Sequence, residues 1–206
     1  MSFTTDQERF WAGEFGDEYI ERNNDKWLIA SNMALFSSVL KRTRGVKSLI
    51  EFGANIGMNL RPLSTLLPKA EISAIEINQK AVEKLNKVER LKSVYHESIL
   101  DFKTDKKFDF VFTKGVLIHI NPDLLDKVYA SMYDCSSRYI CMIEYYNPTP
   151  VEVSYRGHSE KLYKRDFAGE MMQKYPDLEL VDYGFIYKND PVFMQGDATW
   201  FLMQKR

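Results

Sequence analysis

Cysteine and histidine are scarce in this sequence. Among 206 residues there are two cysteines, Cys135 and Cys141, and three histidines. Two cysteines six positions apart, with no cysteine–histidine cluster nearby, form neither a disulfide framework nor a zinc signature. Reduced thiols are typical of the cytoplasm, and the first 15 residues lack the apolar core of an export signal. We therefore expect a cytoplasmic protein that binds no metal.

Long apolar runs and an excess of one charge are also missing. No run approaches the ~18 apolar residues that a membrane-spanning helix needs. The 29 Asp and Glu residues balance the 28 Lys and Arg residues, for a formal net charge of −1, whereas nucleic-acid binding depends on a basic surface. We therefore expect neither a membrane nor a nucleic acid as partner, and the sequence leaves the oligomeric state open.

What the sequence does contain is the composition of one globular domain. Hydrophobic residues make up 45% and charged residues 28%, and a chain of this length fits a single α/β unit. Hydrophobic periodicity divides the chain into three stretches. Residues 1–45 are expected to be helical, residues 46–147 to alternate between strand and helix, and residues 148–206 to hold an insertion and two late strands.

The alternation of elements predicts the fold. Strands are expected at 48–52, 71–77, 93–96, 108–113, 138–145, 178–187 and 198–204, and the helices among them at 58–67, 79–92, 122–135 and 163–174. Repeated strand–helix units predict an α/β fold, a mostly parallel seven-stranded sheet with helices on both faces and a C-terminal antiparallel hairpin. Ligands of such sheets bind outside the carboxyl ends of the strands, so we expect the site there.

A glycine turn, EFGANIG, connects the first expected strand to the helix after it. Gly53 permits a tight turn, Asn55 is one of the few non-glycine residues that tolerate a left-handed conformation, and Gly57 lets the helix pack near the strand. A dinucleotide fingerprint needs a further glycine where Met58 stands, and the acidic Glu51 precedes the turn. The turn therefore fits the pyrophosphate of a dinucleotide poorly.

An acidic residue marks the end of the second expected strand, which reads Glu76-Ile77. A carboxylate at this place can accept two hydrogen bonds from the diol of a ribose. We interpret Glu76 as a ribose ligand, so that the turn and Glu76 together predict a site for a cofactor that contains a ribose.

Residues 47–145 resemble class I S-adenosylmethionine-dependent methyltransferases, whose first motif is an acidic residue followed by G-x-G-x-G. Here the motif reads EFGANIG, with Asn55 in place of the middle glycine. The resemblance implies a Rossmann-like fold, S-adenosylmethionine as cofactor and S-adenosylhomocysteine as product. It also implies that Gly53, Asn55 and Gly57 line the methionine part of the cofactor and that Glu76 and Ile77 hold its ribose.

Two further segments carry the same resemblance. Ser98 and Ile99 follow the third expected strand, where the family usually contacts adenine, and Ser98 stands where the family often has an acidic residue. The fourth expected strand runs into TKGVLIHINP, which is similar to the family's fourth motif, a stretch that passes between cofactor and substrate. The resemblance therefore implies cofactor contacts by Thr113 and Lys114.

The N-terminal stretch narrows the resemblance. FWAGEFGDEYIERN (residues 10–23), together with EFGANIGMNL (residues 51–60), is similar to methyltransferases associated with pseudaminic acid biosynthesis. That likeness implies N- or O-methylation of a nucleotide-activated nonulosonic acid sugar, of pseudaminic or legionaminic type, for bacterial surface glycans or flagellin. We expect residues 1–45 to form a lid, with Tyr19 and Arg22 on one helix face and Arg22 near the methionine carboxylate.

His119 is the candidate general base. Methyl transfer is an in-line displacement in which the enzyme holds the nucleophile against the methyl group and excludes water, and a base takes the proton of the nucleophile. His119 follows the fourth expected strand, and an imidazole has an ordinary pKa that suits proton transfer at neutral pH. Glu144, at the end of the fifth expected strand, is the candidate to orient an amine or amidine or to accept a proton.

Aromatic and basic residues after the fifth expected strand are candidates for acceptor binding. Alternation along the strand places Tyr145 and Tyr146 on opposite faces, and both are expected to bind sugar or nucleobase surfaces. In the insertion, Tyr155, Arg156 and His158 are expected to clamp a sugar carboxylate or a nucleotide phosphate, since arginine suits planar, bidentate contacts. The expected acceptor is therefore a sugar or a sugar nucleotide.

Four alternatives stay open. An NAD(P)-dependent oxidoreductase is disfavoured by Met58, by Glu51 and by the lack of a Tyr-x-x-x-Lys pair. A DNA amino-methyltransferase is disfavoured because no Asn/Asp-Pro-Pro-Tyr/Phe stretch follows the fourth expected strand. A methyltransferase for another small metabolite and a non-catalytic cofactor-binding protein are the other two.

Overall fold

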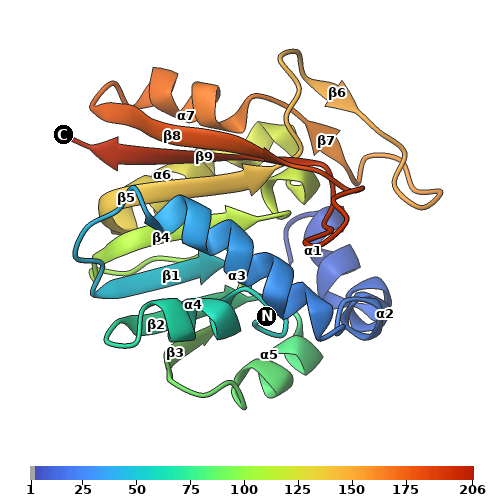
Figure 1. Cartoon of the computed structure of the whole chain (residues 1–206). Helices are drawn as coiled ribbons and strands as arrows, with labels where there is room; N and C mark the ends of the chain where they lie inside the picture. The colour runs from blue at the N-terminus through green and yellow to red at the C-terminus, as the bar shows by residue number, and fades with distance from the viewer. Residues whose placement is uncertain (1–2) are drawn as a thin grey trace.

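A seven-stranded sheet forms the middle layer of the computed structural model, which describes residues 3–206 (Figure 1). The strands are β1 (Ser48–Phe52), β2 (Glu71–Glu76), β3 (Leu91–His96), β4 (Phe108–Lys114), β5 (Ser136–Glu144), β8 (Leu178–Ile186) and β9 (Ala198–Lys205). Their spatial order is β3-β2-β1-β4-β5-β9-β8. The pairs among β1 to β5 are parallel, and β9 runs antiparallel to both β5 and β8. The predicted fold class is confirmed.

Helices cover both faces of this sheet. One face carries α3 (Trp27–Leu40), α4 (Leu60–Leu66) and α5 (Gln79–Leu85), and the other carries α6 (Leu125–Cys135) and α7 (Phe167–Lys174). The sheet is therefore buried on both sides, and the fully buried Phe52 and Phe112 belong to the two opposite cores. Burial of large apolar side chains on both faces is what stabilises a parallel sheet. Within residues 3–206, no helix is long and apolar enough to cross a membrane.

Two short helices, α1 (Asp6–Ala12) and α2 (Glu14–Arg22), lie across the edge where the parallel strands end (Figure 1). The first begins with a capping box, because the Thr5 side chain accepts a hydrogen bond from the backbone of Glu8 and the Glu8 carboxylate accepts one from the backbone of Thr5. We call α1 and α2 the lid helices. A small hairpin of β6 (Val151–Glu152) and β7 (Tyr163–Lys164) lies on the same side of the molecule.

Two helices are shorter than the periodicity predicts. Helical spacing extends to residue 92, but α5 ends at Leu85 because the chain from Leu91 onward pairs with β2 as strand β3. A helix was expected from residue 163, but α7 begins at Phe167 because residues 163–164 pair with β6. In both places, pairing between strands overrides a local preference for helix.

Candidate active site

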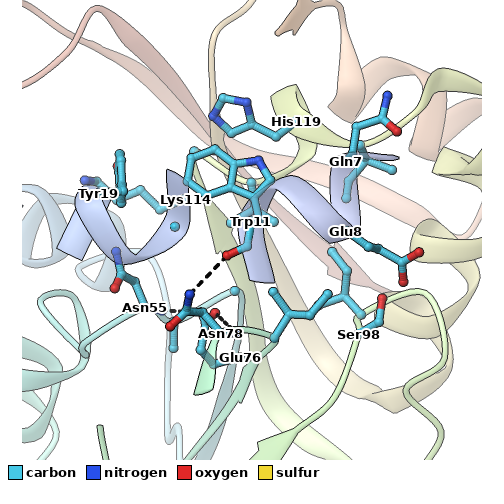
Figure 2. A pocket seen from close by; sticks show the side chains of 18 of the residues that line it. Gln7, Glu8, Trp11, Tyr19, Asn55, Glu76, Asn78, Ser98, Lys114 and His119 are labelled. Carbon is cyan, nitrogen blue, oxygen red and sulfur yellow. Dashed lines mark hydrogen bonds between the residues drawn. The ribbon is translucent and has the colours of Figure 1, made fainter. Parts of the chain in front are cut away.

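A cleft lies at the carboxyl ends of β1, β2, β3 and β4, beneath the lid helices (Figure 2). Its empty volume is about 1260 Å³, including the part that is open to solvent. This is the edge of the sheet at which ligands of parallel α/β folds bind. The predicted residues that line the cleft are Tyr19, Gly53, Asn55, Glu76, Ile77, Ser98, Ile99, Lys114 and His119.

The glycine turn adopts the backbone conformation that its residues favour. Gly53, Asn55 and Gly57 have φ angles of 76°, 48° and 79°, all in the left-handed region. A Cβ atom on Gly53 would lie 2.7 Å from the Val116 side chain, so glycine is needed for the turn to approach the loop after β4. A Cβ atom on Gly57 would lie 2.9 Å from Leu85, which places Gly57 against α5 rather than in the cleft.

Glu76 lies at the base of the cleft and is 7% exposed. Its two oxygens accept hydrogen bonds from the backbone N–H groups of Asn55, at 2.6 Å, and Asn78, at 2.7 Å. Burial raises the pKa of Glu76, and these hydrogen bonds oppose the rise. Because each carboxylate oxygen accepts more than one hydrogen bond, Glu76 both closes the glycine turn and offers acceptors to a ligand.

A buried acid, Glu51, and a half-buried base, Lys114, lie next to this turn. Glu51 is fully buried, and one of its oxygens accepts a hydrogen bond from the Asn59 side chain at 2.5 Å. Burial raises the pKa of Glu51 to about 8, so the carboxyl group is mostly protonated at neutral pH. Burial also lowers the pKa of Lys114, while the nearby Glu51 opposes that change. Glu51 therefore contributes less negative charge to this region than an ordinary carboxylate would.

Asn78, a buried residue after β2, ties the lid helices to the sheet. Its Oδ1 accepts a hydrogen bond from the backbone of Ala81 and caps α5. Its Nδ2 donates to the carbonyl oxygen of Trp11, at 3.3 Å, and to the carboxylate of Asp17, at 2.9 Å. The Trp11 ring, which lines the cleft, packs against Tyr19 with ring centroids 5.1 Å apart. Sequence reasoning missed Asn78, whose one local signal is its place before a helix.

His119 lies above the cleft and is 7% exposed. Its Nδ1 atom is 2.6 Å from the carbonyl oxygen of Lys161. Since a carbonyl oxygen only accepts hydrogen bonds, Nδ1 carries the proton and Nε2 has the free lone pair. Burial lowers the pKa of His119 to about 4, so the ring is neutral at neutral pH. The ring packs against Trp11 and Tyr155, with centroids 4.6 and 4.9 Å apart.

No family model and no curated protein matches the sequence, but solved structures match nearly the whole chain. One is a methyltransferase from Leishmania major, with TM-score 0.74, 14% identity and coverage of 97% of this chain and 87% of that one. A 1,6-didemethyltoxoflavin N1-methyltransferase from Burkholderia thailandensis, with bound S-adenosylhomocysteine, has TM-score 0.71, 11% identity and coverage of 100% and 92%. A magnesium protoporphyrin IX methyltransferase from Synechocystis, with bound S-adenosylmethionine, has TM-score 0.68, 11% identity and full coverage of both chains.

The chain has the fold of class I S-adenosylmethionine-dependent methyltransferases. At 11–14% identity the likeness is one of fold. In this methyltransferase fold the cleft lies at the carboxyl ends of the parallel strands, and α1 and α2 cover the cleft.

Glu144 lies below the loop that follows β4 of the methyltransferase fold. Its buried carboxylate accepts hydrogen bonds from the backbone N–H groups of Val116, at 3.1 Å, and Ile118, at 3.4 Å. Burial raises its pKa to about 7. The structure therefore places Glu144 where it holds the loop that carries His119, and not where it would orient an acceptor as we expected.

Other predicted residues also lie outside the cleft lining, among them Arg22, Thr113 and Tyr146. Arg22 is exposed on α2, where it donates to Glu18 at 3.0 Å and its guanidinium lies 5.1 Å from the centroid of the Phe15 ring. Thr113 is fully buried within β4. Tyr146 is exposed and packs against Phe201 at 5.8 Å between ring centroids. The expected contact between Arg22 and a methionine carboxylate is therefore not matched by the geometry.

The insertion brings two of its three predicted residues against the lid and His119. Tyr155 packs against His119, and the exposed His158 packs against Phe10 of α1 with centroids 5.0 Å apart. Arg156 occupies the tip of the turn between them, with φ 51°. Tyr145 is half-buried at the end of β5. The insertion and α1 thus form one cover over this side of the cleft.

Proposed function

We propose that this chain transfers the methyl group of S-adenosylmethionine to a small-molecule acceptor. The observation that carries the proposal is the placement of Glu76 in a methyltransferase fold: a buried carboxylate with free acceptor capacity, next to a left-handed turn, at the base of a deep cleft. A carboxylate at this place suits the diol of a ribose.

Polar atoms in the cleft support the fit of such a cofactor. Trp11 Nε1, Asn32 Oδ1 and Asn55 Oδ1 are buried and have no hydrogen-bond partner among residues 3–206, and all three residues line the cleft. Buried polar atoms are ordinarily satisfied, so these atoms favour a polar ligand. The two amide oxygens suit the ammonium group of a methionine, while Glu76 suits the ribose.

The chain's own residues would perform two tasks in the reaction. Bound S-adenosylmethionine supplies an electrophilic methyl group on a sulfonium. The lid helices exclude water from the cleft, which preserves the geometry of an in-line displacement. His119 accepts the proton of the acceptor's O–H or N–H group at Nε2, the ring atom with the free lone pair. Glu144 acts indirectly, since it holds the loop that carries His119.

For the acceptor we propose a nucleotide-activated nonulosonic acid sugar of pseudaminic or legionaminic type. The resemblance of residues 10–23 supports this choice, because that stretch builds most of the lid helices. Tyr145, Tyr155 and Arg156 are also close enough to Tyr19 to influence its pKa, which burial raises. Two cations, Arg156 and Arg22, among these phenol groups suit the carboxylate and hydroxyl groups of an acidic sugar.

Isothermal calorimetry tests the cofactor proposal. We expect the protein to bind S-adenosylhomocysteine and to show no heat of binding with NAD. Binding of NAD without binding of S-adenosylhomocysteine would favour the oxidoreductase alternative and overturn the proposal.

Mass spectrometry tests the acceptor proposal. The protein is incubated with S-adenosylmethionine and a panel of nucleotide-activated nonulosonic acids, and we expect one member to gain the mass of one CH2 group. An Arg156→Ala variant is expected to raise KM for that acceptor. A panel without any mass gain contradicts this acceptor class while leaving the cofactor proposal intact, and an unchanged KM removes Arg156 from the acceptor site.

A further inference from the structure

Glu8 brings a buried carboxylate from α1 to one end of the cleft. The residue is 4% exposed and lies beside Ser98, while Tyr19 and Asn55 lie toward the other end (Figure 2). Its Oε2 accepts hydrogen bonds from the backbone N–H groups and hydroxyls of Thr4 and Thr5, at 2.8 to 3.0 Å. Its Oε1 is buried and has no hydrogen-bond partner in the described part of the chain. A buried acceptor of this kind is costly unless a ligand supplies a donor.

The charge of this carboxylate limits which ligand groups it suits. Burial raises the pKa of Glu8, but the nearby hydroxyl of Ser98, which makes no hydrogen bond to Oε1, and the hydrogen bonds from Thr4 and Thr5 outweigh burial and hold the pKa below its ordinary value. Glu8 is therefore ionised at neutral pH. An ionised carboxylate accepts hydrogen bonds and donates none, so a ligand group next to Oε1 must present an N–H or O–H donor.

The position of Glu8 along the cleft indicates which part of a ligand it meets. This step rests on the proposed function, in which Glu76 holds the ribose and the glycine turn holds the amino-acid part. The purine then extends from Glu76 toward Ile77, Ser98 and Ile99, which are among the residues that line the cleft. The isoleucine side chains offer apolar surface to a flat ring, and Ser98 carries no charge. The carboxylate at this end of the cleft is that of Glu8 in α1.

We infer that Glu8 accepts a hydrogen bond from the exocyclic amine of the cofactor's adenine, so that a lid helix recognises the base. The amine is a donor at the edge of the ring, as Oε1 requires. The same Glu8 side chain completes the capping box of α1. Base recognition and the position of the lid are therefore coupled through one residue.

The test compares two ligands by calorimetry: S-adenosylhomocysteine and its inosine analogue, in which an oxygen replaces the exocyclic amine. The wild-type protein is expected to prefer the adenine compound by about 10-fold or more, since a carboxylate faces the donor in one case and an oxygen in the other. In Glu8→Gln, the amide oxygen keeps the bonds to Thr4 and Thr5, and the amide N–H group faces the cleft. We expect this variant to lose affinity for the adenine compound and to lose or reverse the preference.

Matched controls distinguish recognition of the base by Glu8 from displacement of the helix and from failure of the proposed function. Asp6→Asn changes an exposed acid in the same helix and is expected to keep the wild-type preference. An equal loss of affinity for both ligands in Glu8→Gln means a displaced helix and overturns the inference, as does an unchanged preference. A wild-type protein that binds both compounds equally also overturns it. A wild-type protein that binds neither compound overturns the proposed function itself.

Discussion

Burial sets the charge of the ionisable side chains around the cleft. It raises the pKa of Glu51 to about 8 and that of Glu144 to about 7, and it lowers the pKa of His119 to about 4. All three changes favour the neutral form of the group. Spacing along the sequence located these residues next to the strand ends, but their charge depends on contacts with distant parts of the chain.

The raised pKa of Glu51 predicts a pH dependence of stability. Its folded pKa lies above the ordinary 4.5, so its contribution is complete below pH 4.5 and is lost as the pH rises to about 8. The pKa of His119 is lowered instead, so its contribution to stability increases as the pH rises to 6.5 and is constant above that pH. Between pH 6.5 and 8, we expect the free energy of unfolding to fall less steeply in Glu51→Gln than in the wild type, by up to about 1.4 kcal/mol per pH unit.

Urea unfolding at several pH values measures this slope. Glu89→Gln, which changes an exposed carboxylate, serves as the control and is expected to keep the wild-type slope. If Glu51→Gln and the wild type have the same slope, Glu51 is not protonated in the folded protein.

His119 carries the prediction about catalysis. Its Nε2 is free because Nδ1 is held by the Lys161 carbonyl oxygen, and glutamine at this position cannot take up a proton. We expect His119→Gln to lower kcat by about 10²–10⁴-fold and to leave the affinity for S-adenosylhomocysteine nearly unchanged. Steady-state kinetics with the acceptor and calorimetry measure the two effects separately. A variant with normal turnover would show that His119 is not the base.

At the scale of elements, the junction of the two lid helices is packed without free space. A Cβ atom on Gly16 would lie 1.9 Å from the carbonyl oxygen of Trp11 and 2.9 Å from Nδ2 of Asn78. That carbonyl oxygen is the one that Asn78 binds. The approach of α2 to α1 and to the end of β2 therefore depends on the absence of a side chain at Gly16.

A Gly16→Ala substitution is expected to displace the lid helices. The added methyl group forces the backbone at Trp11 to shift, at a cost of about 1–3 kcal/mol in the free energy of unfolding, and it breaks the contact with Asn78. Urea unfolding measures the loss, and calorimetry is expected to show weaker binding of S-adenosylhomocysteine. Glu14→Ala, at an exposed position of the same helix, is expected to change neither. Wild-type behaviour of Gly16→Ala would contradict the packing described for this junction.

For the whole molecule, the lid and the sheet have separate cores. The buried members of the two large hydrophobic clusters begin at Leu35, after the lid helices. Ile20 of α2 belongs to a small third cluster with Ile56 and Ala81. Most of the apolar burial that stabilises the sheet therefore does not involve the lid.

Deletion of residues 1–25 is expected to leave a folded sheet that no longer binds the cofactor. The two large clusters stay complete, whereas Glu8, Trp11 and Tyr19 are lost from the cleft. Circular dichroism follows the folding of the truncated chain, and calorimetry with S-adenosylhomocysteine follows binding. Binding at wild-type affinity would show that the lid helices are not part of the site.

Local patterns in the sequence were sufficient for the order along the chain of the strands that form the seven-stranded sheet and for the glycine turn. Thr5 and Glu8 form their capping box within one turn of helix, and Asn55 takes the left-handed conformation that its short polar side chain tolerates. These features depend on residues close together in the chain, so their physical causes are visible in the sequence. The end of α5 at Leu85 and the start of α7 at Phe167 were not visible in the sequence, because pairing between strands decides them.

The tertiary structure alone decided which side chains meet in the cleft and what state they are in. Glu8 lies beside Ser98, Asn78 binds the carbonyl oxygen of Trp11, and His119 binds that of Lys161, each across many residues of chain. The sequence by itself determined the fold class and the edge of the sheet that holds the site, because periodicity and turn chemistry are local. Burial and contact between distant residues are not local, and they set the partners, the exposed fraction and the pKa of each group.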